Sequence, residues 1–179
     1  MAGQADIGWS NRIGWYEGVY LLSSITPTGV ISGFGFAPAS CNDHALADTF
    51  FAARAHPSPR LPSVGAPAQG VYVADKGFAG DHLHERWKAQ YGAEVVSPPP
   101  QRSKVRWSKD WRRWLAGLRQ IIETIYDKLL TTFRLARERP HALDGLQARL
   151  AKVALHNFCL WLNLRLGRDP VAFADWLDW

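Results

Sequence analysis

The hydrophobic pattern of the chain changes its period once, near Pro98-Pro99-Pro100. Before these prolines, apolar residues come in short runs bounded by Gly, Pro, Asn and Asp, which is typical of strands and turns. After Trp107, apolar residues recur every three or four positions, as they do on one face of a helix. This order of elements predicts an α/β or α+β fold with a helical C-terminal layer.

The boundaries of the expected elements follow from turn and cap residues. Two apolar runs flank Thr26-Pro27-Thr28-Gly29, which predicts a hairpin over about residues 18–36. Asn42 or Asp43 can begin a helix that extends to about Ala53. The remaining expected elements are a strand and turn at 71–80, a basic block and helix at 102–131, and a closing helix at 143–167.

Composition and cysteine usage fit a cytoplasmic globular domain. A chain of 179 residues with 47% hydrophobic and 21% charged residues is long enough to bury a core as a single domain. We find no run of eighteen apolar residues, so no membrane partner is expected. Cys41 and Cys159 match no metal-ligand spacing and are expected to be reduced thiols.

Positive charge is concentrated in the second half of the chain. Residues 1–100 carry a net charge of −2, whereas residues 101–179 carry +7. The block Arg102–Arg119 alone holds seven basic residues and one acidic residue, Asp110. Such a block is typical of a polyanion-binding surface, most often for nucleic acid, although a solvated helix face is the equal alternative.

Three tryptophans follow this block at helical spacing: Trp107, Trp111 and Trp114. They could form stacking platforms for nucleobases. Their spacing favours a second interpretation, in which they begin a buried stripe that continues through Leu118, Ile121, Ile122, Ile125 and Leu129.

Two carboxylates are candidates for chemistry. Asp75 ends a strand and opens a Gly-containing turn, where a side chain can reach a ligand and bind a hard cation. Glu123 shares one face of the next long helix with Arg112 and Arg119, close to where phosphate would bind. Taken alone, each has a simpler explanation: Asp75 as a turn former, and Glu123 as the partner of Arg119 in a surface pair.

Several motifs together resemble bacterial insertion-sequence transposases of the DDE type, over about residues 8–179. Ala74-Asp75-Lys76-Gly77-Phe78, followed by a helix, a strand and Pro98-Pro99, is similar to the second-aspartate motif of that family. The remaining similar segments are Gly14-Trp15-Tyr16, Gly29 to Phe34, Arg119 to Glu123, and Leu146 to Asn157.

The resemblance implies an RNase H-like fold and DNA transposition by metal-dependent strand cleavage and transfer. Asp75 and Glu123 would be catalytic and would ligate Mg²⁺ or Mn²⁺, which prefer oxygen ligands. Arg119 would contact the scissile phosphate or the neighbouring backbone. The implied partners are the DNA ends of the element, and another copy or a full-length transposase, in the bacterial cytoplasm at the nucleoid. The expected DNA contacts are Arg102, Lys104, Arg106, Lys109, Arg112, Arg113, Arg119 and Lys128.

The family's first catalytic Asp has no counterpart that we accept. In the family it lies on a strand well upstream of the hairpin, whereas only eighteen residues precede the apolar run at Val19 here. Asp6 follows no apolar run, and we do not assign it as the missing ligand. We therefore expect a truncated C-terminal part of a transposase, a partial catalytic domain that is inactive at this length, with exposed sheet edges that make it marginally stable or prone to aggregate. The alternative is a non-catalytic DNA-binding remnant that uses the Arg102–Arg119 block.

Overall fold

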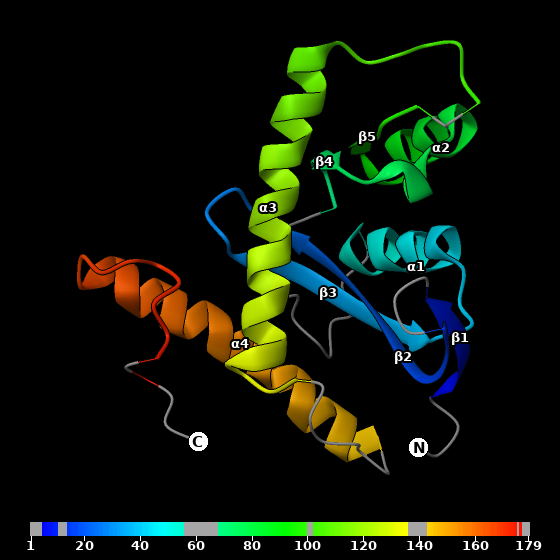
Figure 1. Ribbon diagram of the computed structural model, residues 1–179. Helices are drawn as coiled ribbons and strands as arrows, with labels where there is room; N and C mark the ends of the chain where they lie inside the picture. Colours follow the sequence, from blue (N-terminus) through cyan, green and yellow to red (C-terminus); the bar gives the residue numbers. More distant parts are fainter. Residues whose placement is uncertain are drawn as a thin grey trace. The chain divides into compact units, whose positions relative to one another are not determined.

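The computed structural model describes residues 5–10, 14–55, 68–99, 102–135, 143–174 and 176 (Figure 1). It combines helices with antiparallel and parallel strands, which confirms the predicted mixed α/β class. The elements are β1 (Asp6–Ser10), β2 (Gly14–Ile25), β3 (Ile31–Pro38), α1 (Asp43–Ala55), β4 (Gly70–Val73), the 3₁₀ turn η1 (Lys76–Phe78), α2 (Asp81–Tyr91), β5 (Ala93–Val96), α3 (Lys109–Thr131) and α4 (Leu143–Arg165).

The described strands form two separate sheets. One has the order β1-β2-β3, with β1 antiparallel to β2 and Trp9 directly opposite Trp15. The other pairs β4 with β5 in parallel, and η1 and α2 form the connection between them. This arrangement places the end of β4, with Asp75 just beyond it, next to the start of a helical segment.

A tight turn joins β2 to β3 in the segment that the sequence assigns to a hairpin. The Thr26 N–H donates to the Val30 carbonyl at 2.8 Å, and the Gly29 N–H donates to the Thr26 carbonyl at 2.9 Å. Gly29 has φ = 87°, a left-handed conformation that favours glycine. A Cβ at this position would also lie 3.2 Å from methyl groups of Ile125 and Leu160, so the turn is packed closely as well.

The chain divides into two compact units. The N-terminal unit contains Asp6–Ser24 and Ser32–Ala116, and the C-terminal unit contains Ile25–Ile31 and the chain from Gly117 onward. Each unit has its own hydrophobic core, because the two main buried clusters share no residue. The strands β2 and β3 and the helix α3 pass from one unit to the other.

The core of the N-terminal unit lies between α1, α2 and β5. Phe50 and Phe51 of α1 pack with Trp87 of α2, whose side chain is fully buried. The indole N–H of Trp87 donates to the Asp48 carboxylate at 2.6 Å, and Arg86 forms an ion pair with the same carboxylate. One acidic residue of α1 therefore fixes two consecutive residues of α2.

The core of the C-terminal unit joins α3, α4, the start of β3 and the segment after α4. Ile125, Leu129 and Phe133 pack against Val153 and Leu160. The side chain of Asn157 on α4 binds the backbone of Ile31 at both groups: its Oδ1 accepts from the N–H at 2.9 Å, and its Nδ2 donates to the carbonyl at 2.8 Å. An amide side chain thus pairs with the first residue of β3 as a neighbouring strand would.

The prediction of a buried tryptophan stripe is wrong for its first members. Helix α3 begins at Lys109, so Trp107 precedes it, and Trp111 and Trp114 are 53% and 45% exposed. The three rings pack on one another, with centroids 5.8 Å apart for Trp107 and Trp111 and 5.1 Å apart for Trp111 and Trp114. Helical spacing predicts which side chains share a face, but not whether another element covers that face.

Candidate functional site

Asp75 lies immediately beyond β4 and organises the turn that follows. Its Oδ1 accepts a hydrogen bond from the Gly77 N–H at 2.7 Å and so caps the 3₁₀ turn η1. The residue is exposed. Asp75 therefore forms the turn through its Oδ1, as the simpler interpretation expects. Because the residue is exposed, its carboxylate is also accessible to a ligand.

A second carboxylate lies beside Asp75. A Cβ added to Gly77 would lie 2.9 Å from Asp75 Oδ1 and 3.2 Å from Asp43 Oδ2, so both carboxylates approach the same small residue. Asp43 is the first residue of α1. In the sequence it is a helix-capping residue, and nothing in the spacing of residues 43 and 75 signals that the fold brings them together.

Two histidines hold the backbone of the same turn. The Nε2–H of His44 donates to the Gly77 carbonyl at 2.8 Å, and that of His84 donates to the Phe78 carbonyl at 2.8 Å. These bonds come from α1 and α2, so the turn that carries Asp75 is anchored to both helices. The position of Asp75 is fixed by three elements of the N-terminal unit.

Glu123 lies on α3, within the part that belongs to the C-terminal unit. Its side chain and that of Arg119, one helical turn earlier, are exposed. No ion pair joins them within the described part of the chain, so the simple surface-pair interpretation is not realised here. Asp75 and Glu123 belong to different units.

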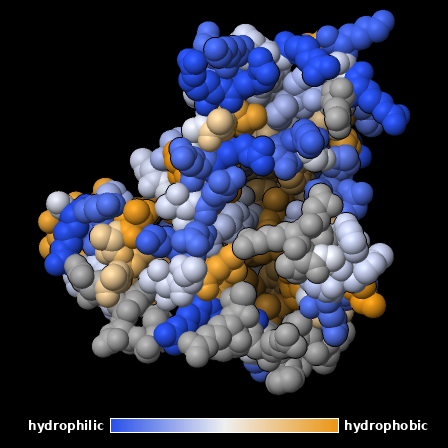
Figure 2. All heavy atoms as spheres, viewed as in Figure 1, coloured by the Kyte–Doolittle hydropathy of each residue, from blue (hydrophilic) through white to orange (hydrophobic). Residues whose placement is uncertain are grey.

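The basic block is a solvent-facing surface. Hydrophilic atoms cover the beginning of α3 and the segment before it, at the top of Figure 2. Arg113 lies 3.6 Å from Asp110, which offsets a small part of the positive charge. Of the basic side chains expected to contact DNA, Lys128 is half-buried and the others are exposed: Arg102, Lys104, Arg106, Lys109, Arg112, Arg113 and Arg119.

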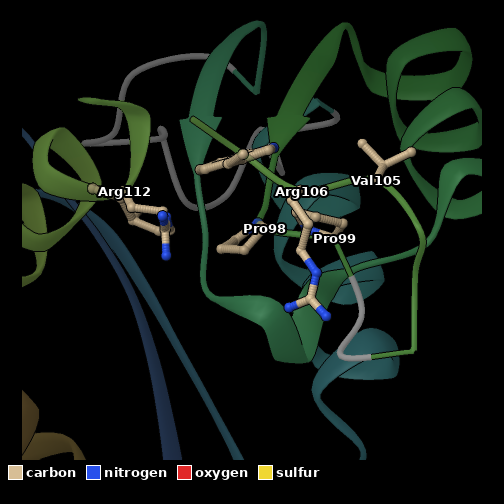
Figure 3. Close-up of a pocket in the computed structure, with 7 residues that line it drawn as sticks. Pro98, Pro99, Val105, Arg106 and Arg112 are labelled. Atoms are coloured by element: carbon tan, nitrogen blue, oxygen red, sulfur yellow. The ribbon is translucent and has the colours of Figure 1, made fainter. Parts of the chain in front are cut away.

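A pocket of about 300 Å³ lies within this basic surface. Its walls come from the end of the β5 segment, the loop before α3 and the first turns of α3. Figure 3 shows Arg106 and Arg112 beside Pro98 and Pro99 at this pocket. Trp107 and Leu115 complete an apolar lining beside two guanidinium groups, a combination that suits an aromatic ring carrying an anionic group.

Asp6, which the sequence analysis set aside, is the first residue of the edge strand β1. Its carboxylate accepts from the Ser40 hydroxyl at 2.7 Å and from the Ile7 N–H at 2.7 Å. These two hydrogen bonds lower the pKa of the Asp6 carboxyl below its ordinary value. Asp6 thus joins β1 to the end of the hairpin.

The described residues do not complete a metal centre. The carboxylates of Asp75, Asp43 and Glu123 are chemically suitable for a hard divalent cation. However, no group of three His, Cys, Asp or Glu side chains within the described ranges is arranged to hold a metal ion.

The comparisons with known proteins give one match. A family model described as "Transposase DDE domain" matches residues 4–158, which include Asp75, Glu123 and the basic block. Neither the curated proteins nor the solved structures give a significant match. In addition, none of the described helices is long and apolar enough to cross a membrane.

Proposed function

The chain belongs to the family of transposase DDE domains, and we propose from this membership that it takes part in DNA transposition by cleavage and transfer of DNA strands. The observation that carries the proposal is the family match, because it spans both candidate carboxylates and the basic block. The match also includes residues of both compact units. Insertion-sequence ends of a bacterium, bound in the cytoplasm, are the substrate that we propose.

In this proposal, Asp75 and Glu123 are the second and third carboxylates of the family's site. The family normally uses divalent metal ions, and Mg²⁺ or Mn²⁺ would supply activation of the attacking oxygen and stabilisation of the leaving oxygen. The hydrogen bond from Gly77 orients Asp75, while Arg119 would hold a DNA phosphate one helical turn from Glu123. Asp43, beside Asp75, would keep negative charge concentrated at the turn.

We propose further that this chain does not cut DNA by itself. The chemistry needs three carboxylates, and we assign only two of them. Asp6 lies on the edge strand β1, and its carboxylate accepts a hydrogen bond from Ser40. Both observations support not counting Asp6 among the catalytic carboxylates. Activity would then require a third carboxylate in addition to Asp75 and Glu123.

A specific observation favours the alternative of DNA binding without cleavage. Trp111 and Trp114 are exposed beside the basic side chains rather than buried, so aromatic and cationic groups share one surface. Single-stranded nucleic acid binds to such surfaces through stacking and phosphate contacts. This surface needs neither carboxylate.

A nicking assay tests the catalytic proposal. Supercoiled DNA is incubated with the parent chain, Asp75→Asn and Glu123→Gln, with Mg²⁺ or Mn²⁺. We expect no metal-dependent nicking by the parent. Metal-dependent nicking by the parent that both substitutions abolish would overturn the proposed inactivity and confirm the carboxylates, whereas nicking that both variants retain would contradict the site.

Salt dependence tests the DNA-binding surface separately. Four phosphate contacts by the basic block would give a slope of log K against log salt of about −3.6 on duplex DNA. Arg106→Ala and Arg112→Ala should each make the slope shallower by about 0.9. Arg168→Ala, which removes an exposed arginine beyond the end of α4, is the matched control and should leave the slope unchanged. A flat slope for the parent would remove nucleic acid from the proposed function.

A further inference from the structure

Helix α4 has a buried apolar face and, within the described part of the chain, a second surface on which large apolar side chains are exposed. Its buried face includes Leu146, Leu150, Val153 and Leu160, and Val153 and Leu160 belong to the core of the C-terminal unit. On its exposed surface, Phe158 and Trp161 are 55% and 54% exposed. A helix that is apolar on both faces normally has a neighbour on each.

The exposed residues of α4 form a continuous stripe. Positions three and four apart on a helix lie on one face, and positions seven apart repeat it. The stripe, which we call the α4 stripe, consists of Asp144, Ala148, Ala151, Ala154, Phe158, Trp161 and Arg165, all of them exposed. Figure 2 shows hydrophobic atoms at the surface near the C-terminal end of α4, at the left of the view.

The two halves of the α4 stripe are complementary in size and in charge. Its first half carries an acidic residue followed by small residues, and its second half carries large aromatic residues followed by a basic one. Phe158 and Trp161 already pack together, with centroids 6.0 Å apart, and the Arg165 guanidinium lies 5.9 Å from the Trp161 ring centroid. Phe158, Trp161 and Arg165 therefore form one contiguous cluster at the surface.

The spacing makes this complementarity symmetric about the midpoint between Ala154 and Leu155. Ala151 and Phe158 are equally far from this point, and the same holds for Ala148 with Trp161 and for Asp144 with Arg165. When two such helices run antiparallel about a two-fold axis, Ala148 and Ala151 of one copy each lie opposite an aromatic residue of the other copy, and Ala154 lies next to the axis. Each end then places a carboxylate opposite a guanidinium.

We propose that the α4 stripe is a self-association surface, through which two copies of this chain form an antiparallel pair of α4 helices around a two-fold axis. The alanines allow close approach of the helices, as in knobs-into-holes packing, and the aromatic residues fill the space above them. This proposal does not rest on the proposed DNA chemistry, because no stripe residue belongs to the candidate site or the basic block.

The first test is the mass of the full chain in solution as a function of concentration. Light scattering should show the mass rising from 20.1 kDa toward twice that value, with a Kd of about micromolar, since one helix pair is a small interface. Phe158→Ser should weaken association at least about tenfold. Leu164→Ser is the matched control: Leu164 is 50% exposed on the same helix but lies outside the stripe. Circular dichroism verifies that each variant is folded.

A charge exchange tests the antiparallel direction. Asp144→Arg alone and Arg165→Asp alone should each weaken association, because each places like charges at both ends of the pair. The double variant should restore it, even though reversed charges at the helix ends disfavour α4 itself. Three results would overturn the proposal: a parent that stays monomeric at several hundred micromolar, association that Phe158→Ser does not change, or a double variant that fails to recover.

Discussion

In the turn after β4, one small residue lies close to two carboxylates. The Gly77 N–H donates to Asp75, and the carboxylates of Asp75 and Asp43 leave no room for a side chain at position 77. Glycine is required here by close approach of the carboxylates. His44, which binds the Gly77 carbonyl, fixes the turn from the other side.

Gly77→Ala should displace the carboxylates and destabilise the fold. The new Cβ would lie 2.9 Å from Asp75 Oδ1, so the cap must shift or break, and we expect a cost of about 1 kcal/mol in the free energy of unfolding. Gly117→Ala on α3 is the control, since nothing lies within 4 Å of its Cβ, and it should instead stabilise by about 0.5–1 kcal/mol. Urea unfolding measures both, and an equal effect of the two substitutions would contradict the close approach.

His156 couples the C-terminal unit to pH. Its ring is fully buried between Phe133 and Phe173, and its Nδ1–H donates to Asn157 Oδ1 at 3.3 Å. Burial lowers the pKa of the imidazole below its ordinary value of 6.5, and the bond to Asn157 opposes this only in part.

The folded chain should therefore lose stability as the pH falls below about 6.5, because the unfolded chain takes up the proton first. Above that pH, the stability that the buried, neutral His156 contributes is fully present. Thermal unfolding from pH 7.5 to pH 5.5 should show a decrease in melting temperature that is smaller in His156→Gln. His82→Gln, at an exposed position on α2, should retain the slope of the parent. If the melting temperature of His156→Gln falls with pH as steeply as that of the parent, a group other than His156 causes the pH dependence.

At the scale of elements, Asn157 joins α4 to the beginning of β3. Asn157→Ala removes both hydrogen bonds to Ile31, whose side chain is buried, and leaves its backbone groups unpaired. We expect a loss of about 2–3 kcal/mol in the free energy of unfolding. Gln147→Ala, at an exposed position of the same helix, should change it by less than about 0.5 kcal/mol. A small effect of Asn157→Ala would mean that water replaces the amide.

Elements of this chain are more predictable than their contacts. The hairpin turn, the strand before Asp75 and the two long helices follow from local turn chemistry and hydrophobic period, which depend on neighbours in sequence. The exposure of Trp111 and Trp114 and the approach of Asp43 to Asp75 depend on what packs from elsewhere. Local patterns carry no information on such tertiary contacts.

At the scale of the whole molecule, the two units have separate cores, and α3 is one of the elements that pass from one unit to the other. The boundary between the units lies between Ala116 and Gly117, in the middle of that helix. A glycine in a helix interior weakens it by about 0.5–1 kcal/mol relative to alanine. The position of Gly117 therefore favours local opening of α3 where the units meet in sequence.

We accordingly expect the units to open separately. Leu46→Ala in α1 and Leu129→Ala in α3 remove the same side chain, each almost fully buried, from different units, and each should cost about 2–5 kcal/mol. Hydrogen exchange followed by mass spectrometry should show faster exchange of α4 in Leu129→Ala, with α2 unchanged, and the reverse in Leu46→Ala. Uniform acceleration of both helices in both variants would mean that the chain unfolds as one cooperative unit, with α3 transmitting the loss of either core across Gly117.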